Sequence, residues 1–267
     1  MFQYLVLPQG YSESPRLFTK ILKIPLAFLR SLGHLNSGYL DDIYLQSDTY
    51  EECCDNIFES AKLLDDLGFT IHTEKSIFIP QQKMEFLGFI LDSQKMLVYP
   101  TDKKCNKIKE ICKTALKKKH MSIQELAKII GNLVAVEPGN RFAPIYYKRL
   151  EILKNKWLKQ AKGDYKQIFQ TNDILREELN WWINNVDKHP RPIEIAKISL
   201  DIYTDASLSG YGMTCEGNKT GGLWNFEEKK LHINILEIMS VKIALLTFCK
   251  NMTSKHIRIF TDNTVTE

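Results

Sequence analysis

Two adjacent acidic residues, Asp41 and Asp42, interrupt a run of apolar and aromatic residues that extends from Gly38 to Leu45. The flanking residues favour β-strand and Asp is common in turns, so the run predicts a β-hairpin with the acidic pair in its tight turn. Two carboxylates this close repel each other unless a cation lies between them, and oxygen ligands suit Mg²⁺ or Mn²⁺. The run therefore indicates a metal site, although an isolated Asp-Asp pair is also typical of a solvated turn.

The residues around this pair resemble those of a known family. The form Tyr-x-Asp-Asp at Tyr39 to Asp42, set between apolar strands, is similar to the catalytic hairpin of reverse transcriptases. Upstream, the run from Leu7 to Gly10 precedes Ser14, a proline and an apolar helix, and it resembles the segment that lines the nucleotide and template pocket in that family. We expect Ser14 to be the N-cap of this helix, because Pro is favoured at the first helical position.

The resemblance implies roles for individual residues. Asp41 and Asp42 would be the catalytic residues that bind Mg²⁺ or Mn²⁺. Gln9 and Gly10 would lie beside the incoming deoxynucleoside triphosphate, where Gly10 lets the backbone approach closely, and Tyr39 would contact the substrate. The other substrate of such a polymerase is a primer-template duplex or an RNA/DNA hybrid.

A helix and several short β-like runs follow the acidic pair. Thr49-x-x-Glu52 matches a capping box and predicts a helix that ends near Gly68. Four runs rich in strand-forming residues come next, at 69–71, 77–79, 85–91 and 96–98. This first part of the chain is therefore expected to mix helices and strands.

Two of these stretches extend the resemblance. The stretch from Gly68 to Lys75 and the run from Phe86 to Phe89 are similar to the next two reverse transcriptase segments. The resemblance makes Lys75 a candidate proton donor to the departing pyrophosphate, and it places Phe86 and Gly88 in the grip that holds the primer. For Lys75, a solvated lysine in a turn is an equally good interpretation.

The segment from Asp102 to His120 predicts an amphipathic, strongly basic helix. Two acids, Asp102 and Glu110, accompany eight lysines in it: Lys103, Lys104, Lys107, Lys109, Lys113, Lys117, Lys118 and Lys119. Charge runs are often solvated faces, but so one-sided an excess favours contact with phosphates. With the helix opened by the capping box Ser122-x-x-Glu125, this segment suits a thumb that grips a duplex. The residues assigned to substrate contact are Lys103, Lys107, Lys113 and Lys117.

Beyond His189-Pro-Arg-Pro, which is typical of a linker, a second unit begins. Three acids lie there at the ends of predicted elements: Asp205 after a strand, Glu237 on a helix and Asp262 after another strand. Asn234-x-x-Glu237 also matches a capping box, so Glu237 has a structural alternative. The ordered set resembles ribonuclease H, which implies that these three carboxylates are catalytic and bind two Mg²⁺ ions.

Together these features predict an α+β chain: a partial palm at 1–100, a helical thumb and connection at 101–192, and a C-terminally truncated ribonuclease-H-like domain at 193–267. The resemblance implies an RNA-directed DNA polymerase with ribonuclease H from a retrotransposon. The local forms at 131–134 and 232–237 are similar to the DIRS-like, tyrosine-recombinase group.

Composition narrows the setting. With 267 residues, of which 44% are hydrophobic, the chain can bury a sizeable core. Its six cysteines include no C-x-x-C pair, which indicates reduced thiols and an intracellular protein of the cytoplasm or nucleus. No apolar run is long enough to span a membrane. The oligomeric state stays open.

The chain also departs from the family pattern. The third polymerase carboxylate of the family would lie on a strand upstream of Gly10, and Asp262 is followed by only five residues. We therefore expect a fragment with weak polymerase activity on its own. The alternatives are a non-catalytic nucleic-acid-binding remnant or domesticated protein, and a nuclease in which only the last domain is active.

Overall fold

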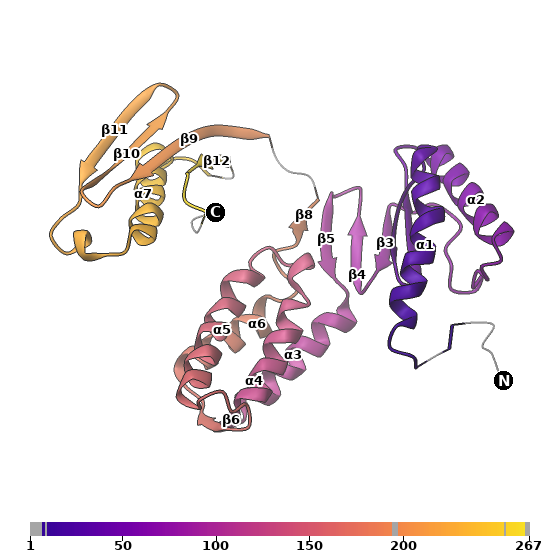
Figure 1. The fold of residues 1–267 in the computed structure, drawn as a ribbon, viewed down its shortest axis with the longest axis horizontal. Helices are drawn as coiled ribbons and strands as arrows, with labels where there is room; N and C mark the ends of the chain where they lie inside the picture. Colours follow the sequence, from indigo (N-terminus) through magenta and orange to yellow (C-terminus); the bar gives the residue numbers. More distant parts are fainter. Residues whose placement is uncertain (1–6, 9, 194–196, 254, 265–267) are drawn as a thin grey trace. The chain divides into compact units, whose positions relative to one another are not determined.

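The computed structural model describes residues 7, 8, 10–193, 197–253 and 255–264, and it has the predicted α+β class (Figure 1). The chain forms two units, residues 1–193 and 194–267. None of the helices in the described ranges is long and apolar enough to cross a membrane.

The first unit begins with two helices packed on a hairpin. Its elements are α1 (Ser14–Ser31), β1 (Leu35–Tyr39), β2 (Asp42–Gln46) and α2 (Tyr50–Asp66). Leucines of α1 and α2, including Leu26 and Leu64, form a small buried core against the hairpin. The predicted capping box of Thr49 and Glu52 is confirmed. The predicted N-cap is wrong: Glu13 is the N-cap and Ser14 is the first helical residue, and the hydroxyl of Ser14 donates to the carbonyl of Pro8.

A four-stranded antiparallel sheet follows, in the order β3-β4-β5-β8. Its strands are β3 (Lys83–Phe86), β4 (Phe89–Asp92), β5 (Leu97–Pro100) and β8 (Arg191–Pro192). The single strand predicted over 85–91 is wrong, since the backbone turns at Leu87 and Gly88, which both have positive φ. The stretch predicted to be a linker contributes β8, which lies at the edge of the sheet. Proline is tolerated in an edge strand, because its missing N–H can face away from the neighbouring strand.

The predicted strands at 69–71 and 77–79 do not form. Phe69 and Ile71 pack instead against the core of α1 and α2. Ile77, Phe78 and Ile79 are exposed. Strand propensity expresses packing on a pleated surface, so these residues remain irregular where no neighbouring strand pairs with them.

The rest of the first unit is a helical bundle. Its elements are α3 (Asp102–Leu116), β6 (His120–Ser122), α4 (Ile123–Val134), the 3₁₀ turn η1 (Glu137–Gly139), α5 (Ala143–Gln160), β7 (Ile168–Gln170) and α6 (Asp173–Asn185). Apolar faces of α3, α4, α5 and α6 enclose one core, which includes Leu126, Leu150 and Trp182. The predicted capping box of Ser122 and Glu125 is confirmed.

The turn η1 packs so closely on the β3-β4-β5-β8 sheet that only glycine fits at position 139. A Cβ atom on Gly139 would lie 2.7 Å from the ring nitrogen of Pro100 and 2.9 Å from a ring carbon of Phe89. We expect Gly139→Ala to lower the free energy of unfolding by about 1–3 kcal/mol, because neither neighbour can move away freely. Urea unfolding measures this. Gly131→Ala is the matched control: its Cβ would meet nothing within 4 Å on α4, so it should stabilise slightly, and equal midpoints for both variants would contradict the packing argument.

The second unit is a four-stranded sheet with one helix across it (Figure 1). Its elements are β9 (Ile198–Ala206), β10 (Gly210–Cys215), β11 (Asn218–Leu223), the 3₁₀ turn η2 (Glu228–Lys230), α7 (Ile233–Phe248) and β12 (His256–Phe260). The strand order is β11-β10-β9-β12, and β12 runs parallel to β9 while the other pairs are antiparallel. Alternate residues of β9 and β10, such as Leu200, Ile202 and Met213, form the core beneath α7.

Candidate functional site

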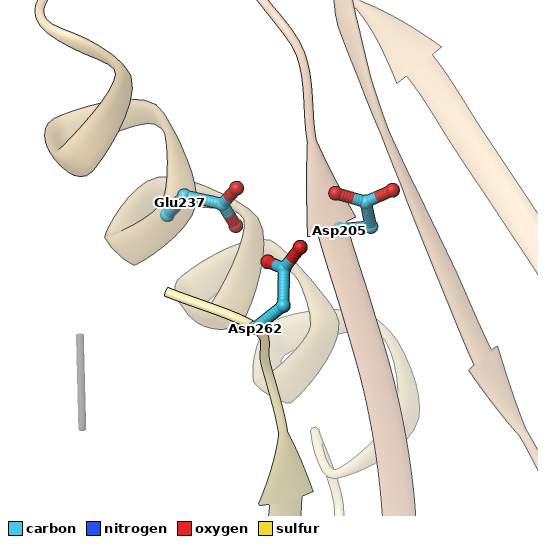
Figure 2. A group of neighbouring side chains, drawn as sticks. All are labelled: Asp205, Glu237 and Asp262. Carbon is cyan, nitrogen blue, oxygen red and sulfur yellow. The ribbon is translucent and has the colours of Figure 1, made fainter. Parts of the chain in front are cut away.

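Three carboxylates of the second unit converge at one edge of its sheet. Asp205 lies near the end of β9, Asp262 follows β12, and Glu237 projects from α7 (Figure 2). One carboxylate oxygen from each residue lies within 4.8 Å of the others. Because β12 pairs in parallel with β9, the two strands end at the same edge, which brings Asp205 and Asp262 together. The convergence expected from the order strand-Asp, helix-Glu, strand-Asp is therefore observed.

Glu237 is the buried member of this cluster. It is 4% exposed, whereas Asp205 and Asp262 are exposed. The backbone amide of Ala206 donates to its carboxylate, while Oε2 has no hydrogen-bond partner. Burial raises the pKa of Glu237, and the negative charges of Asp205 and Asp262 raise it further. A buried carboxylate with one unpartnered oxygen, close to two further carboxylates, is a donor set that fits a hard divalent cation such as Mg²⁺ or Mn²⁺.

The alternative capping role of Glu237 is wrong. Helix α7 begins at Ile233, and its N-cap is His232, whose Nδ1 accepts a hydrogen bond from the backbone amide of Asn234. Glu237 therefore lies beyond the first turn, and its carboxylate points toward the aspartates (Figure 2). The side chain of Asn234 also has another partner: its Oδ1 accepts a hydrogen bond of 3.0 Å from Nδ2 of Asn263. Sequence reasoning missed this pair, because no local pattern connects positions 29 residues apart.

The acidic pair of the first unit lies on the predicted hairpin. Strands β1 and β2 are antiparallel, with Tyr39 opposite Asp42, and Leu40 and Asp41 form the two-residue turn. Asp42 is therefore the first residue of β2 rather than a turn residue. Both aspartates and Tyr39 are exposed. Within the described residues, no third metal-ligating side chain joins Asp41 and Asp42 in a cluster.

The hairpin lies beside the turn predicted to hold the primer. The ring of Tyr44 on β2 is 5.4 Å from the ring of Phe86, between centroids. Beyond the turn, the ammonium group of Lys104 on α3 lies 3.5 Å above the ring of Phe89, next to Gly88. Burial lowers the pKa of Lys104, and the nearby charge of Lys107 lowers it further. Contacts between side chains thus connect β2, the β3-β4 turn and the basic helix.

Three other predicted residues lie apart from these contacts. Gln9 is outside the described residues. Gly10 is exposed, with a φ of 87° that other residues rarely adopt. Lys75 lies in an exposed turn, and its backbone amide donates a hydrogen bond to the carbonyl of His72.

The lysines of the basic segment differ in their partners. Some have contacts within the protein: Lys109 pairs with Asp187, Lys113 with Glu110 and Lys118 with Glu125. Lys103, Lys107 and Lys117 are exposed and have no acidic partner within the described residues. Of the four lysines assigned to substrate contact, only Lys113 therefore has a partner already.

Comparisons with known proteins find relatives for the N-terminal part of the chain. Residues 1–91 match the family model described as reverse transcriptase (RNA-dependent DNA polymerase). The Gag-Pol polyprotein of Gibbon ape leukemia virus is 31% identical over 99 residues, which are 36% of this chain and 6% of that protein. This chain thus spans a small part of that relative. The N-terminal third of the chain carries the sequence pattern of a reverse transcriptase domain.

Solved structures extend the likeness in fold to most of the chain. The foamy viral protease-reverse transcriptase dRH in complex with double-stranded DNA matches with a TM-score of 0.55 and 20% identity, over 95% of this chain and 43% of that one. The foamy viral protease-reverse transcriptase in complex with an RNA/DNA hybrid matches with a TM-score of 0.53 and 20% identity, over 94% of this chain and 33% of that one. The fold of this chain therefore resembles that of the corresponding parts of these foamy viral structures.

Proposed function

We propose that the chain is part of an RNA-directed DNA polymerase whose second unit is a ribonuclease H. The convergence of Asp205, Glu237 and Asp262 carries the nuclease half of the proposal. The hairpin of Asp41 and Asp42, within the residues that match the reverse transcriptase family model, carries the polymerase half. Cleavage of the RNA strand of a hybrid and extension of a primer test the two halves separately.

In the second unit the three acids would hold the metal. Bound divalent ions would activate a water molecule and stabilise the charge that develops on the phosphate. The amide of Ala206 donates a hydrogen bond to the carboxylate of Glu237, and Oε2 of Glu237 has no hydrogen-bond partner within the described residues. Asp205 and Asp262 are exposed, so a phosphodiester backbone can reach them.

In the first unit, Asp41 and Asp42 would hold the metal that binds the triphosphate of the incoming deoxynucleotide. Gln9, Gly10 and Tyr39 would lie against that nucleotide. Phe86 and Gly88 would hold the primer. The contact of Phe86 with Tyr44 places this turn next to β2. Lys75 would donate the proton to pyrophosphate.

We further propose that the chain comes from a retrotransposon of the DIRS-like group and acts inside the cell, in the cytoplasm or nucleus. The domains would be a palm over 1–100, a helical thumb and connection over 101–192, and a ribonuclease H over 193–267. The partner would be an RNA/DNA hybrid or a primer-template duplex, and the similar foamy viral structures contain such nucleic acids. An encoding reading frame that continues upstream through an aspartate-bearing strand and downstream through a further helix would support a polymerase with ribonuclease H over a non-catalytic remnant.

A second candidate is a nucleic-acid-binding remnant without catalysis. The exposed lysines of α3 that have no acidic partner within the described residues favour binding whether or not the acids are active. Flanking stop codons in the encoding DNA, with binding but no cleavage or extension, would support this candidate.

We expect the binding of RNA/DNA hybrids to depend mainly on the three exposed lysines without an acidic partner within the described residues, Lys103, Lys107 and Lys117. The triple variant Lys103→Gln, Lys107→Gln and Lys117→Gln is expected to weaken binding to hybrids of every sequence alike, because these side chains reach phosphates rather than bases. The slope of log affinity against log salt should fall by about 1 for each lysine that no longer binds a phosphate. Fluorescence anisotropy at several salt concentrations measures both effects.

Lys109→Gln is the matched control for this experiment. Lys109 lies on the same helix but pairs with Asp187, so removing its charge should leave the salt slope nearly unchanged. Equal slopes for the triple variant and wild type, or a weakening confined to one sequence, would exclude α3 as the phosphate-binding face.

A further inference from the structure

Hydrogen bonds of Asn263 hold the turn that carries Asp262 on its C-terminal side. The backbone amide of Asn263 donates to Oγ1 of Thr261, 3.3 Å away, and closes the turn around Asp262. The side-chain amide of Asn263 donates to Oδ1 of Asn234 at 3.0 Å and ties the turn to α7. Asp262 itself lies beyond the last residue of β12, so the strand ladder does not fix it.

Asn234 and Glu237 are three residues apart on α7, so their side chains lie on one face of the helix. That face therefore presents one carboxylate to the cluster and one amide oxygen to the turn of Asp262. The three carboxylates repel one another, and the exposed Asp262 is free to move away unless its turn is held. A neutral amide pair holds the turn without altering the charge of the site.

We propose that Asn234 and Asn263 are positioning residues that hold Asp262 within reach of a cation shared with Asp205 and Glu237. This inference rests on the proposed metal-dependent nuclease function. The pair raises the affinity for the metal because the turn is already in its bound position before the ion arrives. Neither asparagine contacts the reacting phosphate in this role.

Binding of Mn²⁺ alone, followed by electron paramagnetic resonance of the free ion, tests the proposal without an activity assay. Asn263→Ala and Asn234→Ala should each weaken Mn²⁺ binding about tenfold, as the removal of hydrogen-bond partners around metal ligands does. The double variant should be no weaker than Asn263→Ala alone, because the bond that Asn234→Ala removes is already absent there. Asn225→Ala is the control, since the side chain of Asn225 accepts hydrogen bonds, within the described residues, only from the backbone amides of Glu227 and Glu228, and it should bind Mn²⁺ like wild type.

Testing Asn263→Ala both in wild type and in Asp262→Asn separates an effect on the position of Asp262 from an effect on general stability. In Asp262→Asn, the further change Asn263→Ala should leave Mn²⁺ affinity unchanged, because the pair acts only through the carboxylate of Asp262. Unchanged affinity of Asn263→Ala in the wild-type background, or the same weakening in both backgrounds, would overturn the proposal. If Asp205→Asn binds Mn²⁺ as tightly as wild type, the metal site itself fails, which is a different result from the failure of the asparagine pair alone.

Discussion

Asp205→Asn is expected to abolish cleavage of the RNA strand of a hybrid, with a rate reduced by more than about 100-fold. Removing an outer hydrogen-bond partner of a metal ligand already costs about 10- to 100-fold, and Asp205 would be a direct ligand. The variant should fold normally, because Asp205 is exposed and its negative charge repels those of Glu237 and Asp262, so that its removal relieves repulsion. Cleavage of a labelled hybrid with Mg²⁺ or Mn²⁺, together with a thermal unfolding curve, measures both outcomes.

Asp201→Asn is the matched control for this variant. Asp201 lies on the same strand, and its carboxylate pairs with the guanidinium of Arg258 through contacts of 2.9 and 2.7 Å, away from the cluster. Because this ion pair is exposed, its removal should change stability little and leave cleavage intact. Full cleavage by a folded Asp205→Asn protein would refute the ribonuclease H proposal.

Asp41→Asn is expected to abolish nucleotide addition in a version of the chain extended upstream to include the aspartate-bearing strand of the family. Asp41 lies in the exposed turn of the hairpin, so the change would remove the proposed metal ligand without disturbing a core. The rate should again fall by more than about 100-fold, since the metal that Asp41 and Asp42 would hold would stabilise the charge on the attacking and leaving oxygens. Extension of a labelled primer measures the effect.

Asp48→Asn serves as the control, because Asp48 is exposed just beyond β2 and lies outside the turn. Retained Mg²⁺-dependent extension by Asp41→Asn would show that the hairpin is not the polymerase site. We expect Asp42→Asn to reduce extension less, because Asp42 is the first residue of β2 and lies outside the two-residue turn.

Local features could be predicted from the sequence because their causes lie within a few residues. Both capping boxes, at Thr49 and at Ser122, form as the pattern predicts, since an N-cap and the residue three positions later are neighbours in any helix. The hairpin around Asp41 forms for the same kind of reason. The sequence also allowed three candidate metal ligands to be selected, from the order strand-Asp, helix-Glu, strand-Asp: Asp205, Glu237 and Asp262.

Local sequence patterns could not predict strands or ion pairs whose partners lie far away in the chain. The runs at 69–71 and 77–79 have strand-forming residues but no neighbouring strand, whereas Arg191 and Pro192 pair with β5 although their composition is typical of a linker. The lysines of α3 look equivalent in the sequence, and only the fold gives Lys109 its partner Asp187.

The amino-acid sequence alone specifies which residues carry the carboxylates and which local elements they lie on. That three of them meet is a consequence of the three-dimensional fold, because it depends on β12 pairing in parallel with β9 and on α7 crossing the sheet. The same fold pairs Asn234 with Asn263 and points Glu237 at the aspartates instead of into a capping box. Hydrogen-bonding capacity is a property of the residue, but the choice among possible partners is made by the packing of segments far apart in the chain.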